Sequence, residues 1–357
     1  MQARPISWGE GPGRATVAES GGRLKKRWQL VVGVLLSAFF VWYAVRGLQL
    51  LEVWKQLRGA NYWWLLPGIA VYFAAVWART WRWHYLLRPV KDIPLGRLFP
   101  VVCIGYFGNN VLPARAGEVL RSYVLSRDEG VAMSTSIATI FVERIFDGLV
   151  MLMFVFAALP VVGFEQIPPI YRSVIVVASV GFLAALLVFL WLAIDQERVK
   201  RLYSGIARRL LPVQARAPAD GLFDRFVTGL AALHNGRDVL MIFVTSVVIW
   251  LLETVKYWFV MHAFEFSVSF VGLMLMNGVV NLTTTLPSAP GYIGTFEVGA
   301  KVLEALGVEK NLAFGYTVVL HAALWFPISA LGAYYMWREG VKWSDASSAK
   351  PISEGQA

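Results

Sequence analysis

The sequence predicts an all-α polytopic membrane protein, with about six full transmembrane helices and two re-entrant Leu-Pro loops arranged as an inverted repeat. Of its 357 residues, 57% are hydrophobic and 16% are charged, and the mean hydropathy is +0.57. A soluble domain would be about one quarter charged. Several runs reach the roughly 18–20 apolar residues that a spanning helix needs. Two Leu-Pro steps break other apolar segments.

The chain begins with a polar segment, residues 1–22, which is rich in Gly, Pro, Ser and Arg and is expected to be a disordered tail. The apolar run at 28–45 is long and lacks a small-residue cleavage site, so we interpret it as a retained helix rather than a signal peptide. We expect one integral membrane domain over residues 23–342 and a second disordered tail at 343–357. The other full spans are expected at 62–87, 134–159, 174–194, 239–264 and 312–337.

Basic residues near helix ends predict that both termini are cytoplasmic, because cytoplasmic loops are enriched in Lys and Arg. The segment RLKKR precedes the first span, and the connection at 195–237 carries eight Lys and Arg residues. In that connection, apolar residues recur at helical spacing from Val199 to Leu210. They predict an amphipathic helix that lies on the inner leaflet or against the protein's own loops. The end of the second span is also basic, with Arg79, Arg82, Arg88, Lys91 and Arg97.

The short segment at 98–113 decides whether this orientation is consistent. A full span there would move the basic 195–237 connection to the outside, whereas a segment that enters and returns keeps every basic loop inside. We therefore interpret NNVLPARAGEVLRSY, residues 109–123, as the turn of a re-entrant element; the alternative is a surface loop. Asn109 and Asn110 are expected to cap its broken helix ends, and Gly117 to leave space for a ligand.

A second Leu-Pro step in NLTTTLPSAPGYIGTFEVG, residues 281–299, indicates an internal repeat. Its Pro287 follows Pro113 by 174 positions, while Arg79 and Lys256 are 177 positions apart. Gly130 with Gly307, and Arg144 with His321, share the 177-residue offset. The repeat halves cover about 61–160 and 238–337. An odd number of crossings between them makes the second half inverted, as in many transporters.

Charged residues are predicted deep in the membrane in FVERIFDGL, residues 141–149. Glu143 and Arg144 lie roughly 14 Å along their helix, near the bilayer midplane. Arg144 and Asp147 are spaced i,i+3 and can pair, and the remaining negative charge requires Arg115, Arg121 or Lys256 as a partner. Glu253 forms a second pair with Lys256, whose side chain could also reach the outer interface. The alternative to a functional pathway is an ion network that only joins helices.

Other function classes find little support. The single cysteine, Cys103, excludes an internal disulfide and a multi-cysteine zinc site, and the four histidines have no metal-ligand spacing. No nucleotide-binding glycine motif or nucleophile elbow is present. The net charge of +10 is explained by basic cytoplasmic loops rather than by nucleic-acid binding. We expect no cofactor and no metal.

Three motifs in order, NNVLPARAGEVLR, ATIFVERIFDGL and LPSAPGYIGTFEVG, resemble the flippase-like transmembrane region of the lysylphosphatidylglycerol synthase family. The resemblance covers residues 28–337. It implies a multi-pass inner-membrane protein that moves polar lipids between leaflets. Because only about 20 polar residues follow Trp337, we expect a member without the soluble aminoacyl-transferase domain. The resemblance carries over Asn109, Pro113, Arg115, Gly117, Glu118, Arg121, Glu143, Arg144, Asp147, Pro287, Gly291, Gly294 and Glu297.

The sequence therefore predicts a flippase of the bacterial inner membrane, not an enzyme, whose partners are lipids with polar or anionic head groups. Arg115 and Arg121 would meet a lipid phosphate, and Glu118 and Glu143 a cationic or sugar head group. The alternatives are a membrane-embedded lipid-modifying transferase and a non-transporting partner of a lipid-synthesis enzyme. The expected substrate-binding residues are Asn109, Arg115, Glu118, Arg121, Glu143, Arg144, Asp147, Lys256, Gly291, Gly294 and Glu297.

Overall fold

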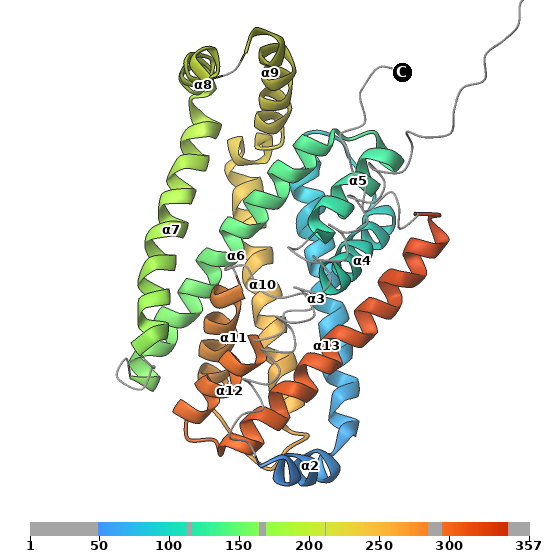
Figure 1. Cartoon of the computed structure of the whole chain (residues 1–357), viewed down its shortest axis with the longest axis vertical. Helices are drawn as coiled ribbons and strands as arrows, with labels where there is room; N and C mark the ends of the chain where they lie inside the picture. The colour runs from blue at the N-terminus through green and yellow to red at the C-terminus, as the bar shows by residue number, and fades with distance from the viewer. Residues whose placement is uncertain (1–48, 113–115, 164–168, 211, 285–294, 342–357) are drawn as a thin grey trace, which may run out of the picture.

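A computed structural model of the chain describes residues 49–112, 116–163, 169–210, 212–284 and 295–341 (Figure 1). Every regular element in these ranges is a helix. The predicted first span at 28–45, the two terminal tails and the second Leu-Pro step lie outside the described residues.

The first half of the chain contains two short helices at one end of the bundle, α2 (Leu50–Gly59) and η1 (Tyr62–Trp64). They are followed by α3 (Leu65–Leu87), α4 (Leu95–Val111), α5 (Gly117–Glu129) and α6 (Met133–Val162). The connection contains α7 (Pro169–Ile194), α8 (Gln196–Leu210), α9 (Val213–Thr228) and η4 (Ala231–His234). The second half contains α10 (Gly236–Met261), α11 (Phe270–Thr284), α12 (Thr295–Ala305) and α13 (Lys310–Arg338).

Three helices in the described part of the chain are long and apolar enough to cross a membrane, namely α6, α10 and α13. The helix α3 has 23 residues, but it carries Arg79 and Arg82, which lower its hydropathy. The helix α7 contributes a shorter apolar stretch at 175–188. The all-α, multi-pass character is confirmed, and the count of six full spans stays a prediction.

The helices α3–α6 and α10–α13 form two sets with the same order. The contacts between the sets also correspond: α3 packs along α10, α4 packs on α13, and α11 packs on α6. Gly130 and Gly307, which end α5 and α12, both have positive φ, 66° and 90°, a conformation that favours glycine at a helix C-terminus. In Figure 1 the pair α4–α5 lies toward one end of the bundle and the pair α11–α12 toward the other.

The first Leu-Pro step ends α4 as expected. A residue before proline is disfavoured in helical conformation, and Leu112 is extended with φ −90° and ψ 146°. The helices α4 and α5 then pack against each other. A Cβ at Gly117 would lie 2.0 Å from the carbonyl oxygen of Gly105. The missing side chain of Gly117 therefore lets α5 approach the backbone of α4, and the expectation that it leaves space for a ligand stays a prediction, since Gly117 also lines the cavity described below.

The basic connection forms the expected helix, α8, which packs against α7 and α9. Its Val199 is buried, and the ring of Tyr203 stacks on Phe223 of α9 with centroids 4.1 Å apart. Leu202 and Ile206 remain about half exposed, at 52% and 49%. Part of the apolar face of α8 therefore packs within the protein, and part of it remains exposed on the surface.

Candidate functional site

A cavity of about 230 Å³ lies between the two helix sets, lined by residues of α3–α6, α7, α10, α11, α12 and α13. At about 30 Å³ per water molecule in the liquid, this volume corresponds to roughly eight waters, which is enough for a polar head group. One part of the lining is charged, and another is apolar, with Met151, Phe182, Val280 and Leu320. The chemistry of the cavity therefore suits an amphiphile.

The deepest contact in the charged part joins α3 to α6. Arg82 donates from Nη1 to Oδ1 of Asp147 at 2.5 Å and to Oγ of Ser246 at 2.8 Å. The indole Nε1 of Trp250 donates to the same Oδ1 at 2.9 Å. Arg82 and Asp147 are each only 2% exposed. Three helices, α3, α6 and α10, thus meet at one carboxylate.

Three further ion pairs extend this contact toward α5 and along α6. Arg121 donates from Nη2 to Oε2 of Glu143 at 2.6 Å, and its guanidinium lies 4.2 Å from the ring centroid of Trp83. Arg144 forms ion pairs with Glu118 at 2.8 Å and with Asp147 at 3.5 Å. Three arginines therefore face three carboxylates. We call Arg82, Arg121, Arg144, Glu118, Glu143 and Asp147 the balanced cluster.

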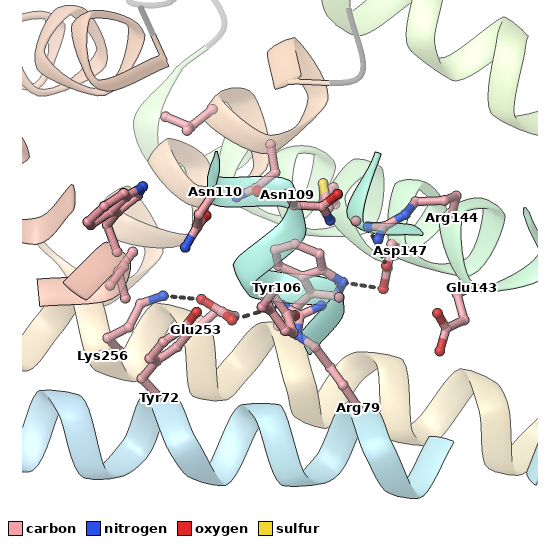
Figure 2. A pocket seen from close by; sticks show the side chains of 18 of the residues that line it. Tyr72, Arg79, Tyr106, Asn109, Asn110, Glu143, Arg144, Asp147, Glu253 and Lys256 are labelled. Atoms are coloured by element: carbon pink, nitrogen blue, oxygen red, sulfur yellow. Dashed lines mark hydrogen bonds and ion pairs between the residues drawn. The ribbon is translucent and has the colours of Figure 1, made fainter. Parts of the chain in front are cut away.

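A second charged group bridges α3 and α10. Arg79 donates from Nη2 to Oε1 of Glu253 at 2.8 Å, and Nζ of Lys256 contacts Oε2 of the same carboxylate. Figure 2 shows both cations reaching Glu253 from opposite sides, with Tyr72 and Tyr106 beside them. We call Arg79, Glu253 and Lys256 the cationic triad, because two cations share one carboxylate.

Residues 30–332 match the family described as the lysylphosphatidylglycerol synthase TM region. The chain belongs to this family.

The similar proteins include membrane proteins and a longer protein named a glycosyltransferase. Two UPF0104 membrane proteins of Methanothermobacter thermautotrophicus are similar: one is 26% identical over 292 residues, covering 76% of this chain and 83% of the relative. The other is 24% identical over 324 residues, covering 85% and 92%. Glycosyltransferase AglD of Haloferax volcanii is 24% identical over 334 residues, which cover 84% of this chain and 53% of that protein. No solved structure matches the chain significantly.

In this family member, the structure brings most of the predicted site residues together. Glu297 lies in the first turn of α12 and does not border the cavity. Arg115, Gly291 and Gly294 lie outside the described residues. The predicted residues that border the cavity are Asn109, Glu118, Arg121, Glu143, Arg144, Asp147 and Lys256.

The predicted pairing of Arg144 with Asp147 is confirmed, and Arg121 is the partner of Glu143. Asn109 and Asn110 are not loop caps, however, because both lie in the last turn of α4. Asn110 donates from Nδ2 to Oγ of Ser329 on α13 at 2.8 Å. Asn109 is one of the residues that line the cavity, and its buried Oδ1 has no hydrogen-bond partner among the described residues.

Two interpretations of basic residues were wrong. Arg79 and Arg82 do not mark a cytoplasmic helix end, since both are buried in the cavity wall and α3 continues to Leu87. Lys256 does not extend to the outer interface, because its side chain is 2% exposed and contacts Glu253. The position of Arg79 in the sequence could have indicated its burial. It lies eight residues before the end of α3, which at 1.5 Å per residue is roughly 12 Å inside the helix.

Groups of three or more potential metal ligands are absent from the described part of the chain. What the arrangement can do chemically is hold a charged group away from water. The guanidinium groups and the lysine supply donors, while the aromatic and apolar lining lowers the local dielectric and strengthens electrostatic contacts.

Proposed function

We propose that this protein is a flippase that moves lipids with polar, phosphate-bearing head groups across the plasma (cell inner) membrane. The observation that carries the proposal is a charged cavity of head-group size between two corresponding helix sets of a membrane protein. Charges inside a membrane protein are costly and usually mark a transport pathway. The family to which the chain belongs supports the same reading.

The proposal includes an orientation. The two helix sets are inverted relative to each other, α4–α5 and α11–α12 are re-entrant hairpins from opposite sides, and both termini are cytoplasmic. Support comes from the positions of the two hairpins at opposite ends in Figure 1 and from the basic residues of α8 and α9. A binding site between inverted repeats suits alternating access, in which one set rocks against the other.

The cavity also suggests where the head group and the acyl chain of a lipid would each bind. The head group occupies the charged part between α3, α5, α6 and α10, and the adjoining acyl chain lies along the apolar part near Phe182 and Leu320. Phe182 is the lining residue contributed by α7, a helix whose other side chains are mostly exposed. The side of the cavity that Phe182 closes is therefore the proposed route between cavity and bilayer.

A membrane-embedded transferase is the second candidate, because the chain is similar to about half of a protein named a glycosyltransferase. In that reading the cavity would bind an acceptor lipid for chemistry. A third possibility is a non-transporting partner of a lipid-synthesis enzyme. We favour transport because the cavity residues form a binding surface of paired charges contributed by both helix sets.

Reconstitution into liposomes tests the proposal. Fluorescent short-chain phospholipids are placed in one leaflet, and their exchange is followed by quenching with a membrane-impermeant reductant. The protein should accelerate exchange without chemical change of the lipid, as checked by mass spectrometry. Arg121→Ala should abolish exchange, while Lys55→Met on the exposed face of α2 should not. Exchange no faster than in empty liposomes, or a chemically altered lipid, would contradict the flippase assignment.

A further inference from the structure

The charge in the cavity is not evenly divided. Among the described lining residues, five are Arg or Lys, four are Asp or Glu, and one is His321, which is counted as neutral. The balanced cluster accounts for three of each, so its charge sums to zero. The remaining residues are Arg79 and Lys256, which share the single carboxylate of Glu253. One positive charge is therefore in excess, and it is located at the cationic triad.

The internal repeat explains this excess. Arg79 and Lys256 occupy equivalent positions, 177 residues apart, and each helix set contributes one cation to the contact between α3 and α10. Glu253 lies three residues before Lys256, and the residue three before Arg79 is Val76, which is fully buried. Two equivalent cations thus converge on a carboxylate that only the second set supplies.

The triad is shielded from water. Lys256, Glu253 and Arg79 are 2%, 6% and 9% exposed. The Nε of Arg79 is also buried and has no hydrogen-bond partner among the described residues. A buried charge without a counter-charge is unfavourable. An anion bound from the cavity would supply both the missing negative charge and an acceptor.

The aromatic rings around the cationic triad also favour a negatively charged ligand. A cationic head group would need a free aromatic face or an excess of carboxylates. The guanidinium of Arg79 lies 4.9 Å from the ring centroid of Trp250. The ammonium of Lys256 lies 4.8 Å from that of Tyr72 and 5.1 Å from that of Tyr257. These faces already hold the protein's own cations, which would repel a bound ammonium group.

We infer that the cationic triad binds the phosphate anion of the lipid head group and makes the protein select lipids of net negative charge over zwitterionic or cationic lipids. The inference rests on the proposed function and adds the charge class of the substrate. It replaces the expectation that Arg121 meets the phosphate, because Glu143 already neutralises Arg121 at 2.6 Å.

Equilibrium binding to the full chain tests the inference. The protein is purified into nanodiscs of phosphatidylcholine, and binding of dihexanoyl phosphatidylglycerol, dihexanoyl phosphatidylcholine and inorganic phosphate is measured by calorimetry. The phosphatidylglycerol should bind at least tenfold more tightly than the phosphatidylcholine. Competition between inorganic phosphate and phosphatidylglycerol at similar concentrations would identify a free phosphate as the ligand, whereas weak competition would identify the lipid.

Two substitutions change the triad in opposite directions. Lys256→Met leaves Arg79 and Glu253 as a neutral pair, so the preference for the anionic lipid should disappear. Glu253→Gln raises the excess charge, so the preference should increase. Lys55→Met removes the lysine of an exposed Glu-Lys pair with the same i,i+3 spacing and should leave the preference unchanged. Should one cavity variant fail to fold, the other and the wild-type comparison still give a result.

The outcomes separate the inference from the proposed function. Equal affinity of the wild type for the two lipids, or preference unchanged in Lys256→Met, would overturn the inference. Charge-selective binding without leaflet exchange in liposomes would support the anion site and contradict the flippase. Rapid exchange of both lipids at equal rates would support the flippase and contradict the anion site.

Discussion

Nη1 of Arg82 lies 2.5 Å from Oδ1 of Asp147, and this contact joins α3 to α6 across 65 positions of sequence. Both side chains are almost completely buried. Because each charge compensates the other in a region of low dielectric, the pair fixes the relative position of the two helices. The same carboxylate orients Trp250 of α10 and approaches Arg144. The contact therefore stabilises the cavity wall against which a ligand would bind.

The first prediction concerns this pair. Asp147→Asn removes the carboxylate closest to the buried Arg82 and leaves Glu143, at 3.7 Å, as its remaining negative partner, so the cost should approach the roughly 3–5 kcal/mol of a broken buried pair. The double variant Arg82→Met/Asp147→Asn removes both charges and should be less destabilised than the sum of the single variants Arg82→Met and Asp147→Asn. Thermal unfolding in detergent, read as a double-mutant cycle, measures the difference.

An exposed pair provides the control. Lys55 and Glu52 on α2 are spaced i,i+3 at 2.8 Å, with side chains 61% and 40% exposed. Exposed pairs contribute about 0–1 kcal/mol, so removing Lys55 should hardly change the unfolding temperature. Additive effects at Arg82 and Asp147 would show that the two residues do not stabilise each other.

The second prediction distinguishes two arginines that share Asp147. The side chain of Arg82 is 2% exposed, whereas that of Arg144 is 37% exposed and lies 3.5 Å from the carboxylate. Arg144→Ala should therefore destabilise the fold less than Arg82→Ala, because Asp147 keeps Arg82 as its partner and water can solvate the partly exposed Glu118. Leaflet exchange should nevertheless fall at least tenfold, since Arg144 borders the cavity. Comparing unfolding temperatures with exchange rates checks both parts; an equal loss of stability would contradict the prediction.

Local features of the fold could be predicted from the sequence. The Leu112-Pro113 step ends α4 because the steric effect of proline acts on its neighbour. The amphipathic spacing in the connection gives α8, and the i,i+3 spacing of Arg144 and Asp147 gives their ion pair. Each of these depends on residues within one helical turn of each other.

Contacts between distant segments could not be predicted in the same way. Arg82 and Arg79 were assigned to a helix end because an arginine near the end of an apolar run usually faces water. Their partners, Asp147 and Glu253, follow 65 and 174 positions later. The burial of the arginines depends on those partners and on the packing of α3 against α10. Neither can be predicted from the composition of α3 alone.

The third prediction concerns the hairpin α4–α5. Gly117→Ala would place a Cβ 2.0 Å from a backbone oxygen of α4 and 2.3 Å from the backbone nitrogen of Asn109. Neither backbone atom can rotate away, so the helices must separate, and the cost should reach at least the roughly 1–3 kcal/mol typical of overpacking. Gly181→Ala on α7 is the matched control, since no atom lies within 4 Å of its added Cβ. A glycine-to-alanine change there should be neutral or stabilising by up to about 1 kcal/mol.

Thermal unfolding of the two variants gives the comparison. A lower unfolding temperature for Gly117→Ala with an unchanged or higher value for Gly181→Ala is expected. Equal behaviour of the two would mean that α4 and α5 are not held in close contact.

The fourth prediction tests the orientation. Cys103 is buried in α4, so the native thiol should remain unlabelled. A cysteine in place of the exposed Arg208 on α8 should be protected from an impermeant maleimide in intact cells and become labelled after permeabilisation. A cysteine in place of Lys55 on α2, at the opposite end in Figure 1, should be labelled without permeabilisation. Labelling of position 208 in intact cells would reverse the proposed orientation.

The last prediction returns to the segment around the first Leu-Pro step. Glu118 opens α5, borders the cavity and pairs with Arg144 at 2.8 Å, with the two side chains 25% and 37% exposed. A partly exposed pair contributes little to stability, so Glu118→Gln should leave the unfolding temperature within a few degrees of the wild type. If Glu118 positions Arg144 for a head group, leaflet exchange should fall strongly in the same variant.

Arg115, which lies outside the described residues, precedes Glu118 by three positions. We expect Arg115→Ala to abolish exchange as well, and Arg115→Lys to restore it only in part, because lysine keeps the charge but loses the two-pronged geometry that matches a phosphate. The Arg127→Ala change, at the far end of α5 where the side chain pairs with its neighbour Asp128, is the control for loss of a basic residue. Wild-type exchange rates in Arg115→Ala or Glu118→Gln would show that the substituted residue is not needed for lipid movement.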